Sequence, residues 1–183
     1  MRAEDSENVI YLGSFSKTIA PGMRVGWALV PPSLKEKLII ASESSILCPS
    51  NFSQLTISSY LADQPWRDQI ASFCDLYKVR RDAMLESLDE HFPVTAKWTK
   101  PGGGFYVWVT LPEEIDTKAL MPKAIVAKVA YVPGTAFYAD GFGSWSMRLS
   151  YCYPTPERIR EGVKALGGVI KTEMARRGGN QLN

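Results

Sequence analysis

The chain has 183 residues, which allows one sizeable domain, or one domain and part of another. Hydrophobic residues make up 45% and charged residues 22% of it, as in ordinary globular proteins. The formal net charge of +2 argues neither for nor against a nucleic-acid partner. No apolar run approaches the roughly 20 residues of a membrane helix, and three widely spaced cysteines fit a reduced cytosolic setting. We therefore expect a soluble, cytoplasmic protein.

The first informative stretch is a lysine on a loop between two short β-favouring runs. Residues 9–12 form the first run, and residues 24–30 form the second, which Pro31 and Pro32 end. In α/β proteins, chemistry is usually located where a strand ends. Lys17 is therefore a candidate for a chemical role, although a solvated hairpin turn is the alternative.

Polar side chains surround this lysine in the sequence. In an extended backbone, Ser14 and Ser16 point to one side, and the turn at residues 21–22 can bring Arg24 toward them. Two hydroxyls and a guanidinium suit a phosphate or another dianion. A lysine beside a bound phosphate suggests a Schiff base to a phosphorylated aldehyde cofactor.

Helical patterns follow from residue 33 to residue 92. We expect Ser33 to cap a first helix, a second helix over residues 52–61, and a long helix over about residues 66–92. In the long helix, apolar residues recur at three- and four-residue steps, which indicates one buried stripe. His91, the single histidine, is expected at its end as a solvated or capping residue.

The C-terminal part mixes strands with helices. Strands are expected over residues 94–98, 105–111 and 129–133, a helix over residues 116–128, and a final helix after Pro156. The glycines at 102–104 open onto a strand rather than a helix, so we interpret them as a turn and not as a phosphate cradle.

Arg148 is the second candidate functional residue. It alternates with Met147 and Leu149 in the apolar–polar pattern of a strand, so it lies on the polar face. A mid-strand arginine usually has an anionic partner, because an unpaired buried guanidinium is costly. A carboxylate ligand, a structural salt bridge and an exposed edge position are the alternatives.

The string SFSKTIAPGMRVGW resembles the lysine segment of fold-type I pyridoxal-phosphate (PLP) enzymes, the class I/II aminotransferases. Within them it is most similar to the aminoadipate, kynurenine and aromatic aminotransferase branch. The resemblance implies that Lys17 is the catalytic lysine that binds PLP, and that Ser14, Ser16 and Arg24 hold the cofactor phosphate. It also implies that Arg148 binds the substrate carboxylate. We expect no metal site, because the sequence has a single histidine and lacks the usual clustering of metal ligands.

The same resemblance predicts an α/β fold in two parts. Residues 1–75 would be the C-terminal fragment of the PLP-binding large domain, with a strand hairpin and helices. Residues 76–183 would be the small α+β domain with an antiparallel sheet, and the helix over about residues 66–92 would link the two. Family members continue upstream of this start, so we expect an incomplete C-terminal portion that is inactive alone.

The implied reaction transfers an amino group between an α-amino acid and a 2-oxo acid. The resemblance further implies a biosynthetic, cytoplasmic enzyme that is a homodimer when complete, with no membrane partner. Two alternatives stay open: an effector module of a transcription regulator, which would bind nucleic acid only through an upstream domain, and a catalytically inert fragment. A lyase or decarboxylating synthase of the same fold is not excluded either.

Overall fold

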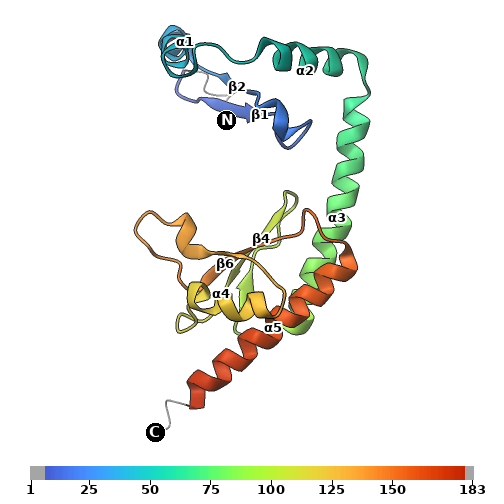
Figure 1. Cartoon of the computed structure of the whole chain (residues 1–183), viewed down its shortest axis with the longest axis vertical. Helices are drawn as coiled ribbons and strands as arrows, with labels where there is room; N and C mark the ends of the chain where they lie inside the picture. Colours follow the sequence, from blue (N-terminus) through green and yellow to red (C-terminus); the bar gives the residue numbers. More distant parts are fainter. Residues whose placement is uncertain (1–6, 180–183) are drawn as a thin grey trace. The chain divides into compact units, whose positions relative to one another are not determined.

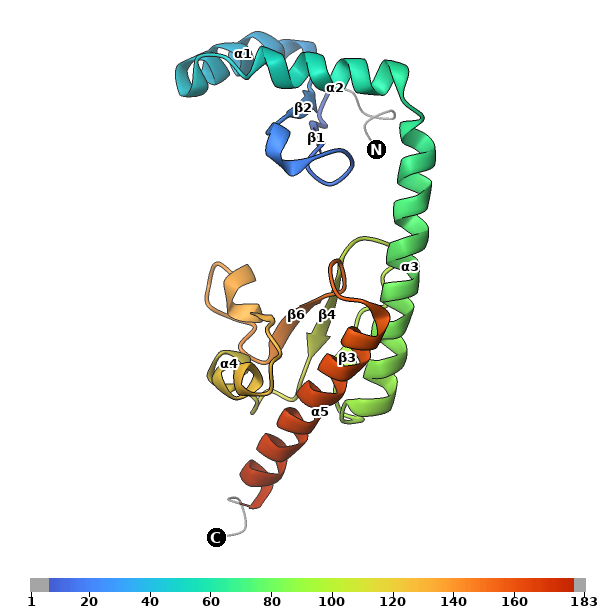
Figure 2. The same cartoon turned by 45° about the vertical axis from the view of Figure 1, so that its right-hand side comes forward.

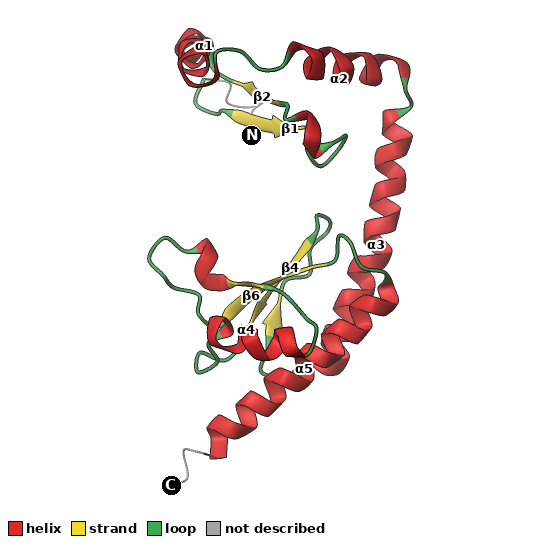
Figure 3. Cartoon of the chain, in the orientation of Figure 1, coloured by secondary structure: helices red, strands yellow, loops and turns green. Residues whose placement is uncertain are grey.

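A computed structural model describes residues 7–179, and these fall into two compact units, one up to Ala71 and one from Ser72 onward. Their helices, strands and loops are distinguished in Figure 3. The domain boundary predicted at residues 75 and 76 stays a prediction. Within the described residues, no helix combines the length and the apolar character that crossing a bilayer requires.

The first unit consists of a two-stranded sheet and helices (Figure 1). The strands are β1 (Tyr11–Ser14) and β2 (Gly26–Leu29), with the short 3-10 helix η1 (Pro21–Met23) between them. Helices α1 (Pro32–Ile46) and α2 (Asn51–Asp63) follow, and α3 (Trp66–His91) begins in this unit. The long helix predicted over about residues 66–92 is therefore present almost to the residue.

The hairpin is held by antiparallel pairing and by aromatic packing. Tyr11 pairs with Leu29, and Ser14 pairs with Gly26. The rings of Tyr11 and Trp27 lie 5.3 Å apart. A Cβ added at Gly13 would lie 2.2 Å from Trp27 Cε2, so only glycine lets the indole approach the opposite strand.

Three local expectations were wrong. The second strand begins at Gly26 rather than at residue 24, because Arg24 is in the left-handed region with φ 55° and ψ 37°. Ser33 does not cap α1, which begins one residue earlier, at Pro32. Proline favours the first helical position, since its fixed φ suits the helix and its missing N–H is not needed there. The strand expected over residues 94–98 is reduced to β3, Lys97–Trp98.

The second unit is an antiparallel sheet with helices (Figure 2). Its strand order is β3–β4–β6–β5. The strands are β3, β4 (Tyr106–Thr110), β6 (Ser146–Ser150) and β5 (Val132–Pro133). The remaining elements are α4 (Thr117–Val126), the 3-10 helix η2 (Gly134–Phe137) and α5 (Pro156–Gly179).

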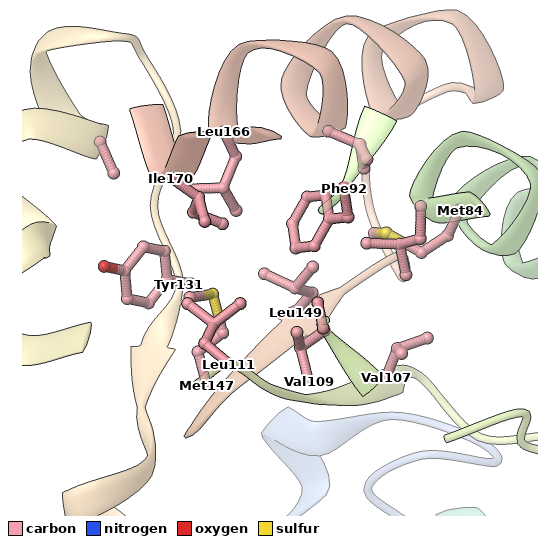
Figure 4. Packing of buried hydrophobic residues seen from close by; sticks show 14 of the residues in the cluster. Met84, Phe92, Val107, Val109, Leu111, Tyr131, Met147, Leu149, Leu166 and Ile170 are labelled. Carbon is pink, nitrogen blue, oxygen red and sulfur yellow. The ribbon is translucent and has the colours of Figure 1, made fainter. Parts of the chain in front are cut away.

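One face of this sheet carries the hydrophobic core (Figure 4). Val107 and Val109 of β4 and Met147 of β6 are fully buried, and they pack in one cluster with residues of α3, α4 and α5. The described part of the first unit contributes only Ile57 to the buried hydrophobic residues. The second unit therefore holds nearly all of the buried apolar side chains, whose burial is the main stabilising contribution to folding.

Helix α4 ends in a C-terminal capping motif with an unusual residue at its left-handed position. The N–H of Val129 donates to Ala124 O, and the N–H of Lys128 donates to Ile125 O, both at 2.9 Å. This pair of hydrogen bonds is the Schellman motif, which places a left-handed residue, most often glycine, after the helix. Here that residue is Lys128, with φ 61°, at a cost of about 1 kcal/mol.

Helices α4 and α5 are joined by a buried carboxylate. Glu173 accepts hydrogen bonds from Lys123 and from Arg177 Nε, the latter at 2.9 Å. Its side chain is only 7% exposed. The hydrogen bonds from Lys123 and Arg177 lower the pKa of Glu173 to about 2.

We expect Leu88→Ala in α3 to lower the free energy of unfolding by about 3 kcal/mol, because it leaves a cavity in the core. Urea denaturation measures this change. Val94→Ala is the control, because Val94 is fully exposed, and it should change the free energy by less than about 0.5 kcal/mol. Equal effects of the two substitutions would contradict the assignment of the core.

The Glu173 carboxylate should stabilise the fold in a pH-dependent way. Its folded pKa, about 2, lies below the ordinary value of 4.5. The stabilisation is therefore complete above about pH 4.5 and is lost as the pH falls toward 2. The stability difference between the wild type and Glu173→Gln, measured by thermal unfolding across this range, should shrink on acidification. A difference that stays constant down to about pH 2 would contradict this coupling.

Candidate functional site

The loop that carries Lys17 wraps around one backbone carbonyl. Phe15 O accepts hydrogen bonds from the N–H groups of Thr18, Ile19 and Ala20, at 3.3, 2.9 and 3.2 Å. The N–H of Phe15 in turn donates to Val25 O at 3.1 Å, which continues the strand pairing. These bonds fix the backbone of the turn, and Lys17 is exposed on it.

The two serines are coupled by a local hydrogen bond. The N–H of Ser16 donates to Ser14 Oγ at 3.1 Å. The expectation of an extended backbone through both serines was wrong, because β1 ends at Ser14 and a turn begins at Phe15. A hydroxyl that bonds to the backbone two residues on is a common feature of such turns.

Arg24 lies on the returning side of the same hairpin end. Its Nη1 donates to Pro21 O at 3.3 Å, not to a serine hydroxyl as the sequence suggested. The side chain is exposed, and its other N–H groups can reach a ligand. Residues 13–26 contain hydroxyls and two cations but no acidic residue. This donor set fits a phosphate group.

Arg148 lies at the middle of β6, between two other strands. Its register partners are Trp108 on β4 and Val132 on β5. Its neighbours Met147 and Leu149 point into the core, so Arg148 faces the opposite side of the sheet. The polar-face position predicted from alternation is confirmed.

The guanidinium of Arg148 is stacked against aromatic rings. Its Cζ lies 4.0 Å from the ring centroid of Tyr106 and 4.6 Å from that of Phe137. Its Nε is buried without a hydrogen-bond partner among the described residues. Ring faces attract the cation but do not accept its N–H bonds in a defined fork. An anionic ligand such as a carboxylate would satisfy it in a way that the described residues do not.

Further aromatic rings lie beside this pair. Trp108 meets Phe137 edge-on at 5.2 Å and lies 6.3 Å from Tyr138. Sequence reasoning did not connect Tyr106, Trp108 or Phe137 with Arg148. Alternation along β4 was the available signal, since every second residue of that strand shares the face of Arg148.

The structure brings four of the predicted residues to one end of the hairpin in the first unit, namely Ser14, Ser16, Lys17 and Arg24. Arg148 belongs to the second unit. The two groups are therefore two sites, each described in its own unit. In the described residues, His, Cys, Asp and Glu do not gather in a group that could hold a metal ion.

Comparison with known proteins identifies the family. The family described as aminotransferase class I and II matches residues 1–166. The chain belongs to this family. It is 48% identical over 175 residues to aromatic-amino-acid aminotransferase 1 of Thermococcus litoralis, which covers 95% of this chain and 42% of that protein. This aminotransferase-family chain thus spans less than half the length of that relative.

Solved structures agree with this assignment and show a fold-type I aminotransferase fold. The multiple substrate aminotransferase of Thermococcus profundus superposes with a TM-score of 0.91 at 47% identity, over 94% of this chain and 43% of that one. The kynurenine aminotransferase of Pyrococcus horikoshii, solved in complex with PMP, gives 0.89 at 45% identity, over 92% and 42%. The chain is also 33% identical to the HTH-type transcriptional regulator YdfD of Bacillus subtilis, over 93% of this chain and 35% of that protein.

The rings of Tyr106 and Phe137 should shield Arg148 Nε from water. We expect Phe137→Leu to speed solvent exchange of the Arg148 Nε–H proton roughly tenfold, equivalent to about 1.4 kcal/mol, the scale of a desolvated cation–π contact. Nitrogen-15 NMR of the arginine side chains measures this rate. Tyr153→Leu, at a side chain that is 89% exposed, is the control and should leave the rate unchanged. Equal rates in all three proteins would contradict the stacking.

Proposed function

We propose that this chain carries the cofactor lysine and the carboxylate-binding arginine of a PLP-dependent aminotransferase, which transfers an amino group between an α-amino acid and a 2-oxo acid. The observation that carries the proposal is the hairpin end: Lys17 is exposed on the turn directly after Ser14 and Ser16, and Arg24 lies on the returning side of the same turn. Membership of the aminotransferase class I and II family supports it.

In this proposal the hairpin residues bind and hold the cofactor. Ser14, Ser16 and Arg24 would hold its phosphate, since hydroxyls and a guanidinium are strong donors to a dianion. Lys17 Nζ would attach the cofactor covalently. PLP, when bound, supplies an electron sink that eases removal of a proton from the substrate α-carbon. Once the substrate amine has displaced it from the cofactor, Lys17 Nζ would accept that proton and return it, as a general base and acid.

Arg148 would position the amino acid in the same reaction. Its guanidinium can take a carboxylate with two parallel N–H bonds. The rings of Tyr106 and Phe137 hold its plane, so the orientation of the carboxylate is restricted before binding. The half-buried ring of Trp108 and the exposed ring of Tyr138 beside it favour an amino acid with a planar apolar side chain.

We also propose an oligomeric state, a cellular location and a metabolic role for the complete enzyme. A homodimer is supported by the many exposed apolar side chains of the first unit, such as Leu12, Leu47 and Phe52. A cytoplasmic location is supported by three free cysteines, which fit a reducing compartment. A biosynthetic role rests on the resemblance to the aminoadipate branch.

An effector module of a transcription regulator is the second candidate. The similarity to the regulator YdfD favours it, because that match covers almost the same part of this chain. Both functions would use the Lys17 hairpin. Release of a 2-oxo acid from an added amino acid separates them, since a sensor needs binding and only an enzyme needs turnover.

Lys17 should be the residue that PLP modifies. After incubation with PLP and reduction with borohydride, mass spectrometry should find the label on the peptide that contains Lys17. Lys17→Ala should abolish the label, because Ser14, Ser16 and Arg24 would hold the cofactor phosphate beside Lys17. Lys35→Ala, at an exposed position of α1, is the matched control and should keep it. Label spread evenly over many lysines would overturn the assignment of Lys17.

A further inference from the structure

The second unit contains a cavity of about 200 Å³ that lies apart from Arg148. It is lined by α3, the end of α4, the end of β6 and the first half of α5. Three of its wall residues, Met84, Leu149 and Leu166, are labelled in Figure 4. Ile159 and Val163 of α5 complete an apolar floor in which every side chain is buried. The floor therefore suits a small hydrophobic body.

The rim of this cavity is polar and positively charged. Lys128, Ser150 and Arg158 line it and are exposed. Glu161 pairs with Arg158 through Nη1 only, which leaves the other guanidinium N–H groups for a further acceptor. Lys128 forms no ion pair with a carboxylate of the described residues. The rim can therefore bind one negative group above the apolar floor.

Two residues that line the cavity are of types that their local backbone conformation disfavours. Lys128 occupies the left-handed position after α4, where glycine is favoured. Gly162 occupies the interior of α5, where alanine is favoured. Packing does not require glycine there, since an added Cβ would meet Val129 Cγ2 at an ordinary 3.9 Å. Each substitution that would improve the backbone would also change the cavity, by removing a charge or by filling space.

We propose that this cavity is a binding site for a small apolar carboxylate, held by Lys128 and Arg158 over the floor formed by α3, β6 and α5. Sequence choices that oppose local preference tend to mark functional positions, and here two of them line the same cavity. The carboxylate contacts the two cations, and the hydrocarbon part fills the space that Gly162 leaves open. Neither Lys17 nor Arg148 lines the cavity, so its occupant is a regulator or an accessory ligand.

The test is a titration of the whole chain with cyclohexanecarboxylate, followed by nitrogen-15 NMR of the backbone amides. We expect saturable shifts centred on Lys128, Ser150 and Gly162, with a dissociation constant on the order of 1 mM for so small a ligand. Cyclohexylmethanol, which has the same ring without the charge, should bind roughly tenfold more weakly.

Three variants separate the site from general effects on folding. Lys128→Gly should weaken binding roughly tenfold by removing one charged donor. Gly162→Ala should weaken it about threefold or more by filling the cavity. Both replacements suit the local backbone conformation better than the native residues do, so we expect the fold to be kept. Gly168→Ala gives α5 the same gain in helix propensity outside the cavity, where a Cβ would meet nothing within 4 Å, and should leave the affinity unchanged.

Arg148→Lys should also leave the affinity within about twofold, since Arg148 does not line the cavity and faces the other side of the sheet. Shifts centred on Arg148 and its aromatic neighbours, or an affinity lost in Arg148→Lys, would overturn the proposal. So would equal binding by the wild type, Lys128→Gly and Gly162→Ala, or the absence of saturable shifts up to about 20 mM.

Discussion

The antiparallel pairing of β4 with β6 is the constraint on which the second unit depends. Its register sets Val107 opposite Leu149 and Trp108 opposite Arg148. Because side chains alternate along a strand, this register gives one apolar face for the helices and one face with a cation and aromatic rings. A slip of one residue would bury Arg148 and expose Met147. The core and the position of Arg148 on the face opposite it are therefore specified by the same hydrogen bonds.

Much of the helical structure could be predicted because it follows from local periodicity. The stripe of α3 extends over many turns, so the prediction of residues 66–92 averages over many residues and matches Trp66–His91. Single-residue features were predicted less well. We expected Ser33 to cap α1, but the helix begins at Pro32, because proline is favoured at the first helical position. The left-handed Arg24 was missed, because non-glycine residues rarely adopt that conformation.

The site residues were named from a motif that is local, since Ser14, Lys17 and Arg24 are near neighbours in sequence. The rings around Arg148 could not be placed in this way. Tyr106 is on another strand and Phe137 on a 3-10 helix after β5, so their meeting depends on the sheet order β3–β4–β6–β5. The α4–α5 network around Glu173 was missed for the same reason, because Lys123 and Glu173 are distant in sequence.

The left-handed backbone of Arg24 would couple folding of the hairpin to binding at the proposed phosphate site. This conformation costs about 1–2 kcal/mol for a residue with a Cβ, and the hairpin supplies that energy before any anion arrives. An anion at Arg24 would then meet a loop whose backbone is already ordered, so only the exposed side chain would still lose entropy on binding. By mass action the relation is reciprocal: whatever binds the folded hairpin also protects it from opening. A phosphate-bearing ligand at Arg24 would thus stabilise the folded loop as well as bind to it.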